Sequence, residues 1–481
     1  MATPNPTAHQ TPSMDSPMAQ TQQRAGSTRT RLTQAQRALL ILALMLCAAW
    51  SDPPDTSGTP SSNAQDTPDA SDQEDTSGPQ DDASAPDAAT DDVLEPQEDI
   101  QEDIPPDEPP PPKCPEGWEE TIALDSEVDI DAPFTVNAPA CTTSEVELVA
   151  PRLTTLLFES LDIPTGSFII AQDALGQTLG TEFVSSQPVS MRFVTQISGA
   201  VSLRVQPPEA PADWTWSGAI TCQEGCGREA TRYPIVLFHG MAGTDRYFGL
   251  LEYFYNVPGE LEALGYEVFT PVTDFIGPSE DRAERLAGQL DDILEQTGAQ
   301  KVHMIGHSQG GIDMRVLVNG MGYDAHTASM TTISSPHNGI PIDLPDFLTG
   351  QNFQEGYMQN EFPQLYPDVE SIPRFSWSGR TCLVLDRDCQ DEMNGERINA
   401  VLIIPFRLLR GAARDDDFDG ANDGIVTVAS SVWGQWLGLL PTDHFDEVGQ
   451  IADSREGPFD HIQFYLDEAR RLRELEKETR P

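Results

Sequence analysis

The chain has 481 residues and a net charge of −50, from 28 basic and 78 acidic side chains. This balance excludes a nucleic-acid binder, because neutralising phosphates requires a basic surface. A multi-span membrane protein is also excluded, since no apolar run reaches the roughly 18–20 residues that a membrane-spanning helix needs. The length allows two or three domains.

The first 50 residues have the pattern of an export leader. Arginines at 24, 29, 31 and 37 precede the apolar run Ala38–Trp50, as in a secretory signal. Cys47 lies where a bacterial lipoprotein carries its lipidated cysteine, although Leu46 departs from the small residue usual before it. Lipidation of Cys47 and ordinary cleavage both remain open. We expect an exported protein, extracellular or anchored to the outer membrane surface as a lipoprotein.

Residues 51–113 form a second region, which we expect to be a disordered acidic linker. Residues 51–112 contain 19 acidic side chains, 13 prolines and no Lys or Arg. Such a stretch cannot bury enough apolar surface to offset the entropy of ordering it. A tether of this kind would hold a domain away from a membrane.

Apart from Cys47, the chain has six cysteines, an even number that favours disulfides in an exported protein. Six cysteines allow 15 pairings. Proximity along the chain favours Cys114–Cys141, Cys222–Cys226 and Cys382–Cys389, and free buried thiols are the alternative.

Residues 114–228 predict a small β-sandwich. Short apolar or alternating runs recur between turn residues. They are Ser144–Val149, Thr154–Phe158, Ser167–Ala171, Ser190–Val194 and Val201–Val205. The 27-residue spacing of Cys114 and Cys141 and the phrase VSMRFVTQ faintly resemble CUB-like domains. No residue cluster here looks catalytic, so a spacer or adhesion module is favoured.

From residue 229 to 481 the pattern alternates between strand and helix, which predicts an α/β fold with a doubly wound, mostly parallel sheet. The expected strands are Tyr233–Phe238, Tyr266–Thr270, Val302–Gly306 and Met330–Ser334. Apolar residues at helical spacing predict amphipathic helices over Asp281–Thr297, ending at Gly298, and over His461–Lys477.

The strongest chemical signal is Gly306-x-Ser308-x-Gly310, placed after an apolar strand and before a helical stretch. A nucleophile elbow needs this arrangement, because only a sharp turn flanked by glycines lifts the serine above the strand end. The helix that follows points its N–H groups at a developing oxyanion. A glycine-rich turn without chemistry is the less favoured alternative.

A nucleophilic serine needs a base and an orienting acid, which in this fold follow it in the order Asp, His. His444, in a loop, is favoured as the base over His461, which lies in the terminal helix. Asp423 is favoured as the acid. Asp415–Asp419 resembles the start of an EF-hand, but position twelve would be Val426, so a solvated acidic turn is favoured there.

The loop after the first strand of this region would supply the second oxyanion donor. Gly240 allows close backbone approach, and the Met241 N–H would donate together with the Gln309 N–H. His239 is favoured as a structural residue.

At this point the chain resembles the secreted bacterial triacylglycerol lipases of the α/β-hydrolase fold, over about residues 230–475. The motifs that carry the resemblance are Tyr233–Leu237 with His239–Asp245, Gly306–Gly311, Ser335–Gly339, Asn422–Val426 and His444–Glu447. Matched residue by residue, it implies Ser308 as nucleophile, Asp423 as acid and His444 as base. It also implies Met241 and Gln309 as the oxyanion pair.

The family also holds a structural calcium ion that steadies the loop bearing the catalytic histidine. The match makes Asp446 one ligand and the carbonyls of Gln450 and Ser454 others. Asp386 fits best as the second carboxylate. Such oxygen ligands suit Ca²⁺.

Two features depart from the family. The cysteine usual after the Asn-Asp-Gly strand is absent at Ala429-Ser430-Ser431. The segment after His337 is short, which predicts an abbreviated cover formed by Asp343–Gly350 and Phe353–Met358.

Together these features predict a serine ester hydrolase, a lipase or carboxylesterase that cleaves acylglycerol or fatty-acyl esters. A polyester depolymerase or an acyltransferase on the same triad is an alternative within enzymes. A surface adhesion module with an inactive hydrolase domain is the alternative from another class. The expected partners are a lipid or ester substrate, a membrane reached through Cys47, and a folding chaperone.

Overall fold

The structure, a computed structural model, describes residues 113–120, 122–241, 243, 246–247, 251–342, 350–450 and 458–479. The predicted leader with Cys47, the acidic linker as far as residue 112, and Ser454 lie outside these ranges. So do residues 343–349 of the predicted cover. In the part of the chain that is described, no helix is both long and apolar enough to cross a bilayer.

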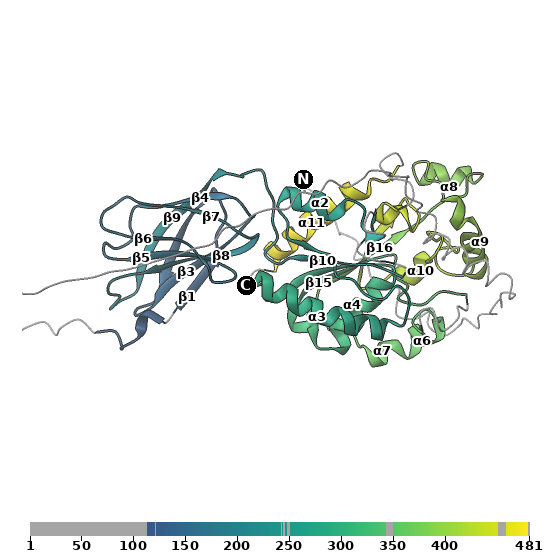
Figure 1. The fold of residues 1–481 in the computed structure, drawn as a ribbon, viewed down its shortest axis with the longest axis horizontal. Helices are drawn as coiled ribbons and strands as arrows, with labels where there is room; N and C mark the ends of the chain where they lie inside the picture. The colour runs from purple at the N-terminus through teal and green to yellow at the C-terminus, as the bar shows by residue number, and fades with distance from the viewer. Residues whose placement is uncertain are drawn as a thin grey trace, which may run out of the picture. The chain divides into compact units, whose positions relative to one another are not determined.

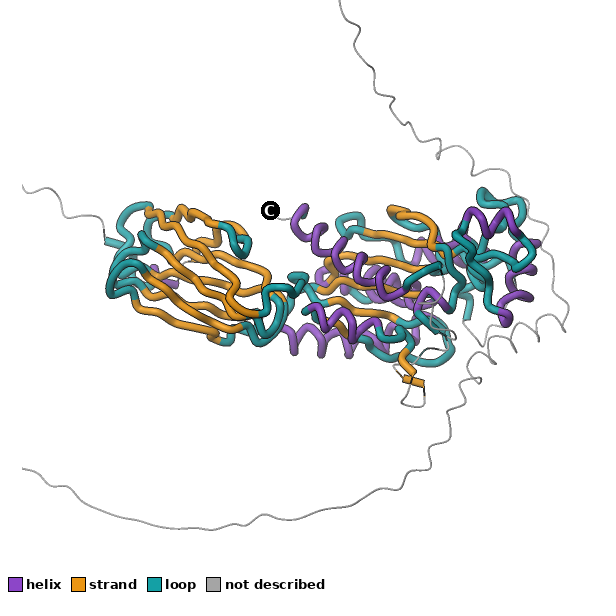
Figure 2. Tube along the Cα trace, turned by 90° about the horizontal axis from the view of Figure 1, so that it is seen from above, coloured by secondary structure: helices purple, strands orange, loops and turns teal. Residues whose placement is uncertain are grey.

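Nine strands between residues 122 and 224 form two sheets (Figure 2). The strands pair antiparallel except for the first and third, which pair parallel. One sheet has the order β1-β3-β8-β5-β6 and the other β2-β9-β4-β7. The strands are β1 (Ile122–Glu127), β2 (Pro133–Ala138), β3 (Thr143–Ala150), β4 (Thr155–Ser160), β5 (Phe168–Asp173), β6 (Thr178–Phe183), β7 (Val189–Val194), β8 (Gly199–Gln206) and β9 (Trp214–Glu224). The five strands predicted in this region correspond to β3, β4, β5, β7 and β8.

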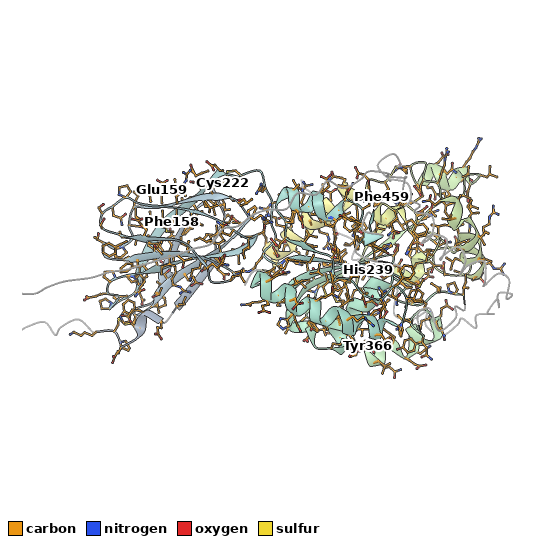
Figure 3. All side chains as sticks on the ribbon, in the orientation of Figure 1. Phe158, Glu159, Cys222, His239, Tyr366 and Phe459 are labelled. Carbon is orange, nitrogen blue, oxygen red and sulfur yellow. A yellow bond between two sulfur atoms is a disulfide. The ribbon has the colours of Figure 1, made fainter. Side chains whose placement is uncertain are left out.

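The two sheets enclose one apolar core, so this part of the chain is a sandwich. Alternate residues of β7 and β8 are buried, as expected when one face of each strand packs inward. Phe158, labelled in Figure 3, and Trp216 are fully buried between the sheets and meet edge to face at 5.9 Å. Such edge-to-face pairs are favourable beyond the apolar area they bury.

A six-stranded sheet follows, with the order β13-β10-β14-β15-β16-β17 and every neighbouring pair parallel. The strands are β10 (Ile235–Phe238), β13 (Val268–Phe269), β14 (Val302–His307), β15 (Thr327–Ile333), β16 (Arg374–Gly379) and β17 (Gln435–Leu440). β10 and β14 are buried along their whole length, as in a parallel sheet covered on both faces. The predicted α/β class is confirmed.

Helices cover both faces of this sheet (Figure 1). The elements are α2 (Val257–Leu264), α3 (Ser279–Thr297), α4 (Gln309–Gly320), α6 (Glu355–Asn360), α7 (Phe362–Leu365), α8 (Arg387–Glu392), α9 (Ile403–Ala412), α10 (Val428–Ser431) and α11 (His461–Glu478), with the short hairpin β11 (Arg246–Tyr247) and β12 (Leu251–Glu252). α3 and α4 share a core with β10 and β14 on one face, and α2 and α11 pack on the other. The strand order reverses at β10, which is where open α/β sheets bind ligands, beyond the carboxyl ends of the strands.

All three predicted disulfides are present. They join Cys114 to Cys141, Cys222 to Cys226, and Cys382 to Cys389. The predicted helix end at Gly298 is also confirmed, since this residue has φ 65° at the C-cap of α3.

Candidate active site

The segment around Ser308 makes a tight turn between β14 and α4. Ser308 has φ 56° and ψ −127°, a conformation that is costly for a residue with a Cβ. A Cβ on Gly306 would lie 2.7 Å from the Gly311 nitrogen, and a Cβ on Gly310 would strike the Phe238 carbonyl. Both glycines are therefore required by the close packing of strand and helix, and the turn has the geometry expected of a nucleophile elbow.

His444 and Asp423 meet from two separate loops. The His444 Nδ1 lies 2.7 Å from the Asp423 Oδ2, and both side chains are buried. The other Asp423 oxygen accepts hydrogen bonds from the N–H groups of Ile425 (2.8 Å) and Val426 (2.6 Å). A carboxylate held in this way fixes the ring and its tautomer, which leaves the His444 Nε2 to accept a proton.

Ser308 lies in the same buried cluster. The ring of His307, the residue before it, is 4.5 Å from the ring of His444 between centroids. On the other side, a Cβ on Gly240 would lie 2.7 Å from the Ser308 Cβ, so the loop after β10 runs directly against the serine. The three predicted catalytic residues thus lie at the carboxyl edge of the parallel sheet: Ser308 follows β14, Asp423 lies against Gly379 at the end of β16, and His444 follows β17.

A buried arginine holds the loop that carries the predicted oxyanion donor Met241. The Arg282 Nη2 donates to the carbonyls of His239 (2.9 Å) and Gly240 (3.3 Å). Its Nε donates to Asp313 on α4 at 2.8 Å, and both side chains of this ion pair are fully buried. The second predicted donor, the Gln309 N–H, is the first of α4 and has no partner within that helix. Arg282 thus supports the loop of one predicted donor, and the other predicted donor has no partner inside α4.

Glu447 forms a second carboxylate contact beside the histidine. Its Oε2 lies 2.8 Å from the His307 Nε2 and 3.9 Å from the His444 Nδ1. Its Oε1 accepts from the Ser334 hydroxyl at 2.5 Å. Burial raises the pKa of Glu447 well above its usual range, and burial lowers the pKa of His307 well below its own. Both directions favour neutral groups around His444.

Three carboxylates gather beside the loop that carries His444. Ligand oxygens of Glu396, Asp443 and Asp446 all lie within 4.8 Å of one another. Burial, followed by the neighbouring carboxylates, raises the pKa of Asp446 to about 8, and burial and Asp443 raise the pKa of Glu396 to about 7. The Asp446 Oδ1 is buried with no hydrogen-bond partner. A hard divalent cation would supply the charge that this group lacks, so these residues fit Ca²⁺.

The structure does not bring Asp386, the expected second calcium carboxylate, to this group. Its Oδ2 lies 3.0 Å from the Arg410 Nη1, and its Oδ1 accepts from the Cys389 N–H at the start of α8. A carboxylate that already neutralises an arginine and caps a helix is not available to a metal. Gln450 lies in the Asp446 loop, where its N–H donates to the Phe445 carbonyl at 2.9 Å.

The other candidates have structural contacts. The Asp416 Oδ1 accepts from the Phe418 and Gly420 N–H groups, so Asp415–Asp419 closes on itself as a turn. His461 contacts the Tyr255 carbonyl from α11 at 2.9 Å. His239, labelled in Figure 3, accepts from the Thr273 N–H at 3.2 Å. These contacts agree with the roles favoured from the sequence.

The chain is similar to several known proteins. A family model described as palmitoyl protein thioesterase matches residues 234–371. A triacylglycerol lipase of Vibrio cholerae serotype O1 is 40% identical over 302 residues, which span 52% of this chain and 90% of that relative. The chain belongs to the triacylglycerol lipase family. This lipase-family chain is accordingly a carboxylic ester hydrolase. A second relative, a triacylglycerol lipase of Pseudomonas fragi, is 27% identical to this chain over 97% of the relative's own length.

Among solved structures, the lipase-family chain is similar to a Staphylococcus hyicus lipase. The two are 16% identical, with a TM-score of 0.42, over 53% of this chain and 98% of the other. It is also similar to a metagenomic carboxyl esterase. The two are 17% identical, with a TM-score of 0.39, over 52% of this chain and 78% of the esterase.

The sequence did not indicate several buried residues that surround the predicted triad. Arg282 was expected only as part of an amphipathic helix, and Asp313, Glu447 and Tyr253 received no role. The Tyr253 hydroxyl lies 2.7 Å from the His307 Nδ1. Only for Glu447 did the sequence offer a hint of proximity to the site, since it lies three residues after the predicted base.

Proposed function

We propose that this chain is a serine lipase that cleaves acylglycerol or fatty-acyl esters through an acyl-enzyme. The observation that carries the proposal is the 2.7 Å contact between His444 and Asp423, in the same buried cluster as Ser308 in its strained turn. A serine hydroxyl is a weak nucleophile on its own and needs a base that is itself oriented. The family assignment and the complete set of residues favour an enzyme over an inactive adhesion module.

In the first step, the Ser308 Oγ attacks the ester carbonyl carbon while the His444 Nε2 accepts the hydroxyl proton. Asp423 stabilises the resulting imidazolium without taking the proton. The carbonyl oxygen becomes an oxyanion, which the Met241 and Gln309 N–H groups would stabilise. Arg282 contributes indirectly, because it holds the two carbonyls that precede Met241.

Collapse of this intermediate expels the alcohol, which takes the proton from His444 and leaves an acyl group on Ser308. Water then attacks the acyl-enzyme, with His444 accepting its proton. The second collapse releases the fatty acid and returns the proton to Ser308.

For the carboxylate group, we propose a calcium ion bound by Asp446 together with Glu396 and Asp443. The carbonyls of Gln450 and Ser454 remain proposed ligands. The ion would contribute structure rather than chemistry, by neutralising the carboxylates beside the loop that carries His444. Asp386 has no part in this proposal.

We also propose that the protein is exported. Three disulfides within the described residues support an oxidising compartment. The leader pattern supports the same conclusion. The Cys47 sulfur would carry a lipid anchor.

The substrate class is tested by comparing emulsified long-chain triglyceride, a chain-length series of dissolved p-nitrophenyl esters, and a polyester film. The proposal expects wild-type protein to release fatty acid from the emulsion, with Ser308→Ala as the inactive control. Turnover of dissolved short esters alone would make the chain a carboxylesterase. Faster release from the film than from triglyceride would favour a polyester depolymerase.

A further inference from the structure

Arg282 contacts the peptide group that carries one of the predicted oxyanion donors. Its Nη2 donates to the Gly240 carbonyl at 3.3 Å, and this carbonyl shares one planar peptide bond with the Met241 N–H. In a trans peptide these two groups point in opposite directions, so a guanidinium on the carbonyl side fixes where the N–H points. The same guanidinium donates to the His239 carbonyl at 2.9 Å and to the Asp274 carbonyl. The direction of the Met241 N–H therefore depends on where the guanidinium lies.

Asp313 holds that guanidinium from α4. Its Oδ2 accepts from the Arg282 Nε at 2.8 Å, and neither side chain is exposed to solvent. Asp313 comes one helical turn after Gln309, so the two residues lie on the same side of α4. Gln309 is the first residue of this helix and carries the second predicted donor. One helix therefore carries one donor and anchors the arginine that directs the other.

Core packing alone does not account for a carboxylate at this position. The Asp313 Oδ1 is buried and has no hydrogen-bond partner among the described residues. A buried ion pair is often no more stabilising than apolar residues of similar volume, because both charges lose their hydration. An apolar side chain would fill the space without leaving an oxygen unpaired. A role in directing Arg282 explains the carboxylate.

We propose that Asp313 is a positioning residue, which acts through Arg282 to keep the Met241 N–H directed at the same point as the Gln309 N–H. The inference rests on the proposed acyl-enzyme mechanism, in which these two groups stabilise the oxyanion. Without the carboxylate, the guanidinium loses its anchor on α4 and the Met241 N–H meets the oxyanion less well. The loss falls in the transition state, because the ester carbonyl of the bound substrate does not yet carry the full charge.

The first test is hydrolysis of a dissolved p-nitrophenyl ester by the full chain at pH 8. Asp313→Asn should lower kcat by about tenfold and leave KM within about twofold, since even the outright loss of a donor costs roughly 10²–10³-fold in kcat. Arg282→Lys keeps the charge but loses the fork, and should have the same effect. The double variant should lose no more than the worse single variant, because both residues act on one peptide group.

The matched control is Glu468→Gln. Glu468 is a buried carboxylate on α11 that pairs with Arg471 at 2.5 Å, away from both donors. Its loss removes an ion pair of the same kind and should leave kcat unchanged, whatever its effect on the melting temperature.

A pH series separates positioning from a loss of packing. Burial raises the pKa of Asp313 to about 6, although Arg282 and the Ser279 side chain lower it, and Glu280 raises it further. His239 is neutral in this range, because burial and Arg282 lower its pKa to about 3. Wild-type Asp313 should therefore lose its charge below about pH 6 and act as asparagine does. The ratio of wild-type kcat to Asp313→Asn kcat should fall from about ten at pH 8 towards one at pH 5, since the titration of other groups cancels in the ratio.

The proposal is overturned if folded Asp313→Asn keeps the wild-type kcat, if its loss lies in KM alone, or if the ratio stays constant between pH 8 and pH 5. Losses of the two single variants that multiply in the double variant would also overturn it. Asp313→Ser removes the same charge and replaces the asparagine variant if that variant does not fold. If Ser308→Ala keeps turnover, the proposed function fails. If Ser308→Ala is inactive while Asp313→Asn matches wild type, only the positioning role fails.

Discussion

At the scale of single residues, the proposed mechanism depends on the contact of Asp423 with His444. Replacing it by asparagine keeps the shape but removes the acceptor that fixes the Nδ1–H tautomer. Asp423→Asn should therefore lower ester turnover by roughly 10⁴-fold, the size of the serine-protease case, with little loss of folding. The measurement is kcat/KM on a dissolved ester, together with the melting temperature.

Asp419→Asn is the matched control, because Asp419 is exposed in the neighbouring acidic turn. It should leave turnover within a small factor of wild type. A larger loss in Asp419→Asn than in Asp423→Asn would show that a turn residue had been confused with the orienting acid.

The sequence could predict the triad candidates because each lies in a short motif with its own local signal. Ser308 has its flanking glycines, and His444 follows Asp423 in the order that the fold requires. Glu447 and His307 are different, since their contact joins residues 140 positions apart and no local pattern encodes it. The Asp386 prediction shows the same limit, because only the structure reveals that Arg410 lies opposite it.

At the scale of elements, the loop after β17 brings Asp443 and Asp446 beside Glu396, and the stability of this region should depend on pH and calcium. The pKa of Asp446 is raised to about 8 and that of Glu396 to about 7, while both ionise near pH 4 in an unfolded chain. Between about pH 4 and pH 8 the folded state therefore binds more protons than the unfolded state. Metal-free protein should lose stability as the pH rises through this window.

Calcium should reverse this loss and should add about 2.7 kcal/mol at 100 times its dissociation constant. The measurement is the melting temperature at pH 6 and pH 8, in chelator and in calcium. Asp446→Asn should raise the melting temperature in chelator and abolish the calcium response. Asp386→Asn should keep that response. A melting temperature indifferent to chelator and calcium in wild type would contradict the proposed site and leave the triad untouched.

Helices with a clear apolar stripe were the most predictable elements. α3 begins two residues before its predicted start, and α11 ends one residue beyond its predicted end. α9 was not anticipated, because its apolar residues serve two small clusters rather than the main sheet. α8 was not anticipated either, because Cys389 is its only apolar residue. A pattern read along the chain cannot distinguish such local packing from a loop.

At the scale of the whole molecule, the described residues form separate apolar cores. The sandwich core uses only residues between 128 and 222, and the two cores of the parallel sheet use only residues between 235 and 475. From the change in strand pattern near residue 229 we expect a domain boundary there, and this boundary stays a prediction. The three disulfides could be predicted from the sequence, because each cysteine pairs with its neighbour along the chain.

The most direct test of the central claim is covalent labelling of the full chain with a fluorophosphonate, followed by peptide mass spectrometry. We expect one modified residue, Ser308, and no labelling in a folded Ser308→Ala variant. Ser190→Ala, which removes an exposed sandwich serine, should label as wild type does. A label on another residue, or equal labelling of folded Ser308→Ala, would contradict the assignment of the nucleophile.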